Sequence, residues 1–237
     1  MMLLFKFILN LTFLAEAVRN IKIVAGEINL KISVLFGTVL RTNNYLITSD
    51  NASILIEASC SLDELKSELN GKKLDAILLT HAHWDHYSNL QKISDFYCCP
   101  VYLTCEGLEK IKAPERAFAT DRKPKIDCEK VDFKIIQDGD VLTFGKELKF
   151  KVISTPGHTN CSVCYLFENE KQNLLFSGDT IFEQGIGRVD LPTGSFEEIK
   201  QSIKKILKLD DKTAIFPGHG PKTTLYFERD FLTWNFN

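Results

Sequence analysis

The sequence predicts a mixed α/β or α+β domain. Short apolar runs typical of strands occur in both halves of the chain, two helix-start signals lie among them, and no stretch rich in glycine, serine or proline separates the halves. The 237 residues, 44% apolar and 25% charged, match one ordinary globular domain in length and composition. We therefore predict a single domain over residues 21–237, preceded by an extra apolar segment over residues 1–20.

Residues 1–20 suit more than one role. Ala15-Glu16-Ala17 is similar to a signal-peptidase site, but the basic region that should precede it is missing, and Lys6 and Asn10 interrupt the apolar run. The run is also short for a membrane span. We favour an amphipathic or buried helix packed on the domain. A weak export signal and residues added by an early start codon are the alternatives.

The first half predicts strands joined by turns and then alternating helices and strands. Strands are expected over residues 21–24, 31–40, 44–48, 53–57, 74–79 and 100–103. Ser61 to Glu64 is a capping box, and Asn70-Gly71 ends the helix that it starts. Further helices are expected over residues 87–94 and 106–112.

Residues 113–132 interrupt this pattern. They contain two prolines and little periodicity, so they predict a surface loop, which is either a functional lid or a solvated connection. Its basic residues would attract an anionic substrate in the first case and would simply be solvated in the second; they are Arg116, Arg122, Lys123 and Lys125.

The second half returns to strands, expected over residues 133–136, 141–144, 148–153, 162–167, 174–176 and 213–216. Ser195 to Glu198 is a second capping box. The helix that follows it has an apolar stripe typical of packing against a sheet, formed by Phe196, Ile199, Ile203, Ile206 and Leu207. Residues 223–237 predict a short helical tail.

Four potential metal ligands follow the strand over residues 74–79 within six positions: His81, His83, Asp85 and His86. A strand that ends in such residues delivers them to the rim of a sheet, where loops build sites. Imidazole and carboxylate suit zinc, and imidazole also suits iron. The alternative is a polar loop whose histidines cap neighbouring groups, and three histidines with an aspartate at this spacing make it a minority interpretation.

The two remaining histidines and a further aspartate repeat this design. His158 follows Pro156-Gly157, His219 follows Pro217-Gly218, and Asp179 follows Gly178, each after an apolar run. Small residues beside a ligand permit a tight turn and leave room for an ion. One Pro-Gly-His is usually just a turn, but four strand ends that present His or Asp together predict a metal site.

These motifs resemble the metallo-β-lactamase superfamily, whose signature is His-x-His-x-Asp-His followed by distant His, Asp and His. Residues 155–159, 176–180, 185–188, 190–192 and 217–221 also resemble the glyoxalase II-like hydrolases, most closely the short branch without a separate C-terminal helical domain. The resemblance covers residues 35–230. It implies the α/β (α+β) fold of that superfamily, a four-layer αβ/βα sandwich.

The resemblance also implies two divalent metal ions, expected to be zinc, with iron or manganese as alternatives. It assigns the ligands to two ions: His81, His83 and His158 to one, Asp85, His86 and His219 to the other, and Asp179 to both. Seven ligands are too many for one tetrahedral zinc ion, which takes four. In such a centre a hydroxide held between the ions is the nucleophile, and Asp85 and Asp179 are the expected catalytic residues.

The expected activity is hydrolysis of a small-molecule thioester or ester, with a glutathione-derived thioester as the candidate substrate. The alternative is an oxidoreductase similar to persulfide dioxygenases, with one iron on His81 or His83, His158 and Asp179. The complete second ligand set disfavours that alternative. A zinc-stabilised binding protein is a third hypothesis, disfavoured because structural zinc sites are closed and usually rich in cysteine.

Residues near the ligands have structural interpretations as well. We expect Trp84 and Tyr87 to pack in the core and Arg188 and Asp190 to form an ion pair. Thr159 and Thr180 are expected to make hydrogen bonds within the ligand loops. The resembled family has an aspartate at the end of the last strand of the first meander. This chain has Glu57 there, a departure that puts the support of the ligands in doubt.

The net charge and the cysteine content limit which partners and which cellular compartment are expected. The net charge is 29 − 31 = −2, so no strong field attracts nucleic acid or an anionic membrane. The seven cysteines predict reduced thiols in a cytoplasmic protein, with Cys98-Cys99 in the core. Cys161 and Cys164 predict ordinary buried cysteines on opposite faces of a strand, with a redox or zinc pair as the alternative. The sequence predicts no particular oligomeric state.

Overall fold

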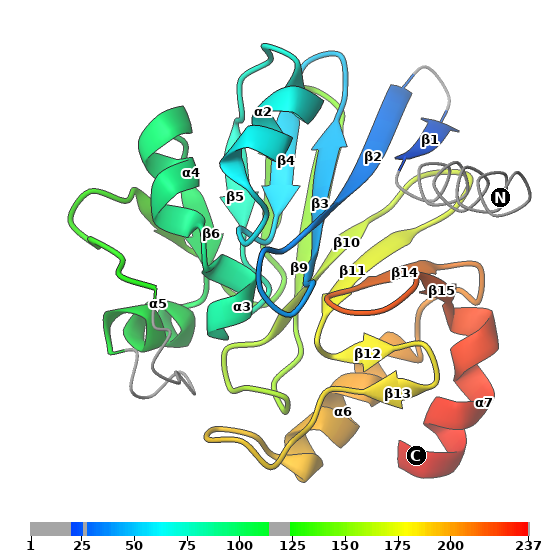
Figure 1. The fold of residues 1–237 in the computed structure, drawn as a ribbon. Helices are drawn as coiled ribbons and strands as arrows, with labels where there is room; N and C mark the ends of the chain where they lie inside the picture. The colour runs from blue at the N-terminus through cyan, green and yellow to red at the C-terminus, as the bar shows by residue number, and fades with distance from the viewer. Residues whose placement is uncertain (1–19, 26–27, 114–123, 237) are drawn as a thin grey trace, which may run out of the picture.

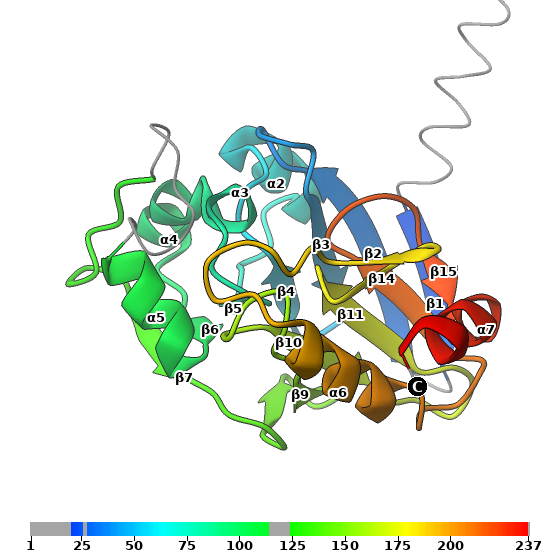
Figure 2. The ribbon, with the colours of Figure 1, turned by 90° about the horizontal axis from the view of Figure 1, so that it is seen from below.

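In the computed structural model, residues 20–25, 28–113 and 124–236 are described, and two β-sheets pack face to face with helices on their outer sides (Figure 1). The view from below shows helices α6 (Phe196–Ile206) and α7 (Leu225–Phe236) across the sheets from helices α2 (Leu62–Leu69) and α3 (Trp84–Tyr87) (Figure 2). This is the four-layer αβ/βα sandwich that the resemblance implied. The N-terminal segment over residues 1–19 lies outside the described residues.

The first sheet contains seven strands in sequence order: β1 (Asn20–Ala25), β2 (Ile28–Phe36), β3 (Asn43–Thr48), β4 (Ser53–Ile56), β5 (Ala76–Leu78), β6 (Val101–Leu103) and β7 (Phe133–Ile135). The first four strands pair antiparallel, and β4 to β7 pair parallel. Parallel neighbours need long crossovers, which here contain α2, then α3 with α4 (Leu90–Tyr97), then α5 (Cys105–Lys112).

The second sheet has the strand order β15 (Thr223–Thr224), β14 (Ala214–Pro217), β11 (Leu174–Gly178), β10 (Val163–Phe167), β9 (Leu148–Ser154) and β8 (Val141–Phe144). Only β11 and β14 pair parallel, and the crossover between them contains α6. A small hairpin of β12 (Ile181–Phe182) and β13 (Gly185–Ile186) stands apart from both sheets. The sequence interpretation missed this hairpin because each strand has only two residues.

Three hydrophobic layers hold the sandwich together. One lies between the two sheets, the second between the first sheet and helices α2 to α5, and the third between the second sheet and helices α6 and α7. The expected stripe on α6 packs in the third layer through Ile199, Ile203 and Ile206, each 0% exposed, whereas Phe196, also expected in the stripe, is 49% exposed. Four layers of secondary structure require three such cores, and the alternating apolar strands and amphipathic helices provide them.

Replacing Phe176 with alanine is expected to lower the free energy of unfolding by about 3–5 kcal/mol. Phe176 is 1% exposed between the sheets, stacks on Phe216 at 5.1 Å and meets Tyr45 edge-on at 5.3 Å, so truncation leaves a cavity lined by rigid rings. Urea unfolding would measure the change. Tyr226→Ala, at a side chain 67% exposed, is the control and should shift stability little.

Strand direction decides where the site lies. Strands β9, β11 and β14 run the same way, because β10 is antiparallel to both β9 and β11 and because β11 and β14 are parallel. Their carboxyl ends therefore meet at one edge of the second sheet. Backbone hydrogen bonds from Val163 N to Thr80 O (2.9 Å) and from Asn43 N to Gly218 O (2.7 Å) join this edge to the first sheet.

The helix expected over residues 87–94 is wrong in its bounds. The structure has two helices instead, α3 and α4, with a break at Asn89. The backbone N–H of Asn89 donates to Ala58 O (2.9 Å), and its side-chain amide donates to Ser59 O (2.9 Å) and Thr38 Oγ1 (3.0 Å). These tertiary bonds replace the helical ones, and no periodicity in the sequence reports them.

Other boundaries also differ from expectation. The strand expected to reach residue 40 ends at Phe36, since Leu40 and Arg41 adopt positive φ in a turn. Cys99 is buried as expected, but Cys98 is exposed because it ends α4 in the left-handed conformation. Within residues 113–132, positions 114–123 lie outside the described residues, and the rest is irregular as expected of a loop.

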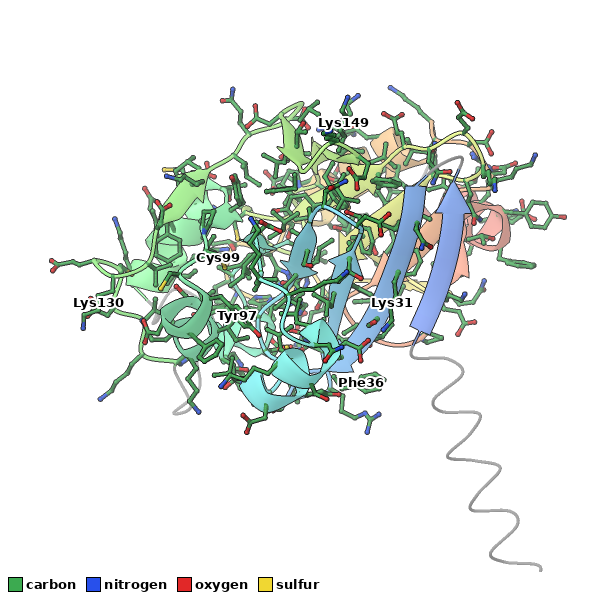
Figure 3. All side chains as sticks on the ribbon, turned by 90° about the horizontal axis from the view of Figure 1, so that it is seen from above. Lys31, Phe36, Tyr97, Cys99, Lys130 and Lys149 are labelled. Atoms are coloured by element: carbon green, nitrogen blue, oxygen red, sulfur yellow. The ribbon has the colours of Figure 1, made fainter. Side chains whose placement is uncertain are left out.

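The outer face of the first sheet carries α2, which Figure 3 shows beside Lys31 on β2. Lys31 forms an ion pair with Glu68 of α2, and Ser33 donates to the same carboxylate oxygen at 2.7 Å.

Within the described ranges, no helix has the length and apolar character required to cross a membrane.

Candidate metal centre

All seven residues that the sequence predicted as ligands meet at the edge where the two sheets join. The turn after β5 carries His81 and His83, and α3 begins just beyond them with Asp85 and His86. The other three follow the strand ends already described: His158 after β9, Asp179 after β11 and His219 after β14. Six of the seven residues are buried or nearly buried. The seventh, His219, has a side chain that is 30% exposed.

Three ring nitrogens converge in the first group. Nε2 of His81 and Nε2 of His158 lie 3.1 Å and 2.9 Å from Nδ1 of His83. One imidazole N–H cannot serve two partners, whereas three nitrogens around one point suit a tetrahedral cation with one open position. All three residues are buried, so their nitrogens face one another and not open solvent.

The second group contains Asp85, His86 and His219. Oδ2 of Asp85 lies 3.2 Å from Nε2 of His219 and 3.6 Å from Nε2 of His86. Thr42 also donates to this oxygen at 3.1 Å, which helps to fix the carboxylate. The sequence interpretation missed Thr42, because it lies 43 positions away in a turn with no motif of its own.

Asp179 lies between the two groups. Its Oδ2 is 3.6 Å from Nε2 of His158 in the first group and 3.8 Å from Nε2 of His219 in the second. Its Oδ1 is 3.4 Å from Nε2 of His86. A single carboxylate therefore reaches ligands of both groups, which is the position that a bridging ligand requires.

Unsatisfied buried atoms show that the residues fit metal ions. Among the described residues, neither ring nitrogen of His86 nor Oδ1 of Asp179 has a hydrogen-bond partner. Each such atom costs about 1–3 kcal/mol when it is buried unpaired. A cation in the second group would satisfy Nε2 of His86 and Oδ1 of Asp179, whereas Nδ1 of His86 faces Glu57. A donor set of imidazole and carboxylate suits zinc or iron.

The pKa shifts of three of the histidines agree with ligand roles. Burial lowers the pKa of His81 well below its ordinary value and lowers that of His83 to about 3, with neighbouring histidines adding to both effects. Burial also lowers the pKa of His158. His86 differs, since Asp179, Asp85 and Glu57 outweigh its burial and raise its pKa well above the ordinary value. Neutral imidazoles with free nitrogens are the form that binds metal.

The metal-free protein is expected to lose stability as the pH falls from about 7 to about 4. In the unfolded chain, histidines take up protons near their ordinary pKa of 6.5, whereas folded His81, His83 and His158 do so only at lower pH. The unfolded state then binds more protons, so stability decreases on acidification. His86 acts oppositely, because its contribution is complete below pH 6.5 and is lost as the pH rises through its raised folded pKa. Thermal unfolding with a chelator tests this, and a Tm that rises on acidification would contradict it.

Glu57 supports the ligands from behind. It follows β4, is 1% exposed and adopts a φ of 66°, so the chain turns sharply there. Its Oε1 accepts a hydrogen bond from Thr80 Oγ1 (2.5 Å) and lies 3.3 Å from Nδ1 of His86. Glu57, which stands where the resembled family has an aspartate, therefore still places a carboxylate behind the ligand. Its longer side chain reaches His86.

Replacing Glu57 with glutamine is expected to weaken binding of the cation at His86 by about 10–100-fold, because a neutral amide no longer orients and polarises that imidazole. Titration with zinc in competition with a chromogenic chelator would measure the affinity. Glu106→Gln on the exposed face of α5 is the matched control and should leave the affinity unchanged. Equal affinities in all three proteins would contradict the supporting role.

The remaining expectations near the site are confirmed. Trp84 and Tyr87 are 8% and 0% exposed and pack in the layer between the first sheet and its helices. Thr180 and Thr159 make hydrogen bonds inside the ligand loops, to Thr155 at 3.0 Å and to Ser162 at 2.7 Å.

The loop that follows β13 also contributes to the site. Arg188 pairs with Asp190 at 2.6 Å and 2.8 Å, as expected of an ion pair that braces the loop. Its backbone carbonyl lies 2.7 Å from Nδ1 of His158, a contact that the sequence did not predict. That contact fixes the His158 tautomer and leaves Nε2 free to face the cluster.

Comparison with known proteins places this architecture in a family. The model of the metallo-beta-lactamase superfamily matches residues 37–219. A probable metallo-hydrolase of Bacillus subtilis, YqgX, is 32% identical over 195 residues, which cover 81% of this chain and 90% of that protein. A hydroxyacylglutathione hydrolase of Francisella philomiragia is 34% identical over 187 residues, which cover 76% of this chain and 63% of that protein.

Solved structures agree with the sequence relatives. The crystal structure of the BLEG-1 B3 metallo-beta-lactamase superimposes with a TM-score of 0.76 and 33% identity, over 85% of this chain and 99% of that chain. The matched region contains all seven clustered residues, from His81 to His219. With its fold, its clustered ligands and these relatives in agreement, the chain belongs to the metallo-beta-lactamase superfamily.

Proposed function

We propose that this protein is a thioesterase of the hydroxyacylglutathione hydrolase type that works with two divalent metal ions. The observation that carries the proposal is the position of Asp179, within 3.8 Å of histidines in both ligand groups. The Francisella relative supports the substrate class, and the B. subtilis relative supports a metal-dependent hydrolase in general.

Two of the ligand groups in the structure support the assignment that the resemblance implied. His81, His83 and His158 would hold one ion, Asp85, His86 and His219 would hold the other, and Asp179 would contact both. When bound, two such ions supply a water of lowered pKa at neutral pH and a Lewis acid for a carbonyl oxygen. Zinc suits this donor set best, with iron or manganese as alternatives.

The chain's own residues would prepare the site for hydrolysis. Although burial opposes ionisation, His86, His219 and Thr42 lower the pKa of Asp85, so this group remains a carboxylate at neutral pH. A carboxylate held by two hydrogen-bond partners is suited to accept a hydrogen bond from an attacking water and so to orient it. The histidines around Asp179 likewise lower its pKa against the effect of burial. Both carboxylates are therefore proposed as catalytic residues.

Metal analysis combined with two assays tests the proposal. Protein purified without added metal is expected to contain two zinc ions per chain and to hydrolyse S-lactoylglutathione. Oxygen consumption on glutathione persulfide, measured alongside, reports the oxidoreductase alternative. One iron per chain with oxygen consumption and no thioester hydrolysis would overturn the proposal, since the second ligand group would then have no catalytic part. His83→Ala is the inactive reference for both assays.

A further inference from the structure

A lysine lies buried beside the loop that carries His158. Lys110 is on the inner side of α5 and is only 5% exposed. Across the described parts of the chain, none of the ion pairs formed by carboxylates involves its amine. A buried lysine without a carboxylate partner is costly, so its actual neighbours define what it does.

Two side chains contact the amine. Nζ of Lys110 donates to Thr193 Oγ1 at 2.6 Å and lies 3.6 Å from Sγ of Cys161. Cys161 is 2% exposed, and its sulfur also lies 3.2 Å from Thr159 Oγ1. Thr193 has a φ of 68°, a rare conformation for a β-branched residue, and its bond to Lys110 helps to hold it there. The amine and the thiol are thus fixed close together.

We infer that Lys110 and Cys161 form a redox modification site, in which peroxide joins Nζ to Sγ as a sulfenamide. The thiol sulfur attacks hydrogen peroxide: an S–O bond forms, the O–O bond breaks, and one water leaves. The Nζ nitrogen then attacks the sulfenic sulfur: an N–S bond forms, the S–O bond breaks, and the departing hydroxyl leaves with an N–H hydrogen as a second water. Sulfur loses two electrons and one peroxide gains them, so one thiol, one amine and one peroxide give the bridge and two waters.

The geometry favours this product over the usual ones. The 3.6 Å separation is close to the distance from which bound groups react, so the amine can intercept the sulfenic acid before further oxidation. At 2% exposure, Cys161 is shielded from a bulky thiol that would form a mixed disulfide. Cys161 and Cys164 pack in different hydrophobic layers, so the neighbouring cysteine is not placed to form a disulfide.

The bridge would join α5 to the ligand loop between His158 and β10. The carbonyl of Cys161 already accepts a hydrogen bond from Thr104 Oγ1 (3.4 Å), the residue that caps α5. The modification therefore requires no large rearrangement. It rests only on the Lys110–Cys161 contact and is independent of which metal or substrate the protein uses.

Mass spectrometry of the full-length protein tests the site. Reduced protein is incubated with hydrogen peroxide, digested with a glutamate-specific protease and analysed without reductant. The expected product is a linked pair of peptides containing Lys110 and Cys161, lighter than their sum by about 2 Da, which dithiothreitol separates again. Cys161→Ser and the charge-preserving Lys110→Arg should each abolish it. Cys164→Ser, at a buried cysteine that contacts Thr155 and Ser177 instead of a lysine, should retain it.

Other products would overturn the inference. Cys161 recovered unlinked as a sulfinic acid, about 32 Da heavier, would show that the amine does not intercept the sulfur. A linked species that persists in Lys110→Arg would show that another group is the partner. Circular dichroism of each variant confirms that it is folded before the comparison is made.

Discussion

Asp179→Asn is expected to lower kcat for thioester hydrolysis by about 10³-fold while leaving the fold intact. The carboxylate lies within 3.4–3.8 Å of His86, His158 and His219, so its charge serves both ligand groups at once. Asparagine keeps the shape but has only one acceptor oxygen and no charge. We therefore expect weaker metal binding at both positions and loss of the second catalytic carboxylate.

Turnover of S-lactoylglutathione and metal content per chain measure this effect, and far-UV circular dichroism reports the fold. Asp95→Asn on the exposed face of α4 is the matched control and should keep full activity. An Asp179→Asn enzyme that retains wild-type turnover would contradict a mechanism in which this residue serves two ions. If it lost activity but kept both ions, the role of Asp179 would be in the reaction rather than in binding.

Gly218→Ala is expected to remove most bound metal and to reduce turnover by at least about 100-fold, since a 1 Å misplacement of catalytic groups has effects of this size. A Cβ at this position would lie 2.3 Å from Oδ1 of Asp179 and 2.7 Å from Cε1 of His86. The backbone cannot easily withdraw, because Gly218 N donates to Gly178 O (2.8 Å) and Gly218 O accepts from Asn43 N (2.7 Å). The added methyl group must therefore displace ligands.

Metal analysis after dialysis, followed by the thioester assay, tests this expectation. Gly185→Ala is the control, since its added Cβ would meet nothing closer than 3.8 Å and its backbone has no positive φ. It should bind metal and turn over substrate as the wild type does. Full metal content in Gly218→Ala would mean that the loop relaxes and that close approach at this glycine is not required.

Much of the fold could be predicted because local patterns report it. The strands with apolar alternation and the helices that begin at Ser61 and Ser195 occur where expected, since turn residues and capping boxes act within a few positions. The break at Asn89 and the hairpin at residues 181–186 were missed. The first depends on bonds to residues 38, 58 and 59, and the second has too few residues to show a period.

The sequence by itself identified the seven candidate ligands, because histidine and aspartate after strand ends carry their chemistry in their identity and spacing. Only the tertiary structure decided that Thr42 and Glu57 hold Asp85 and His86, and that Lys110 faces Cys161. These contacts join residues between 29 and 51 positions apart, or depend on which way a side chain points once two sheets have packed. Such distances follow from the packing of the whole chain, and no local pattern contains them.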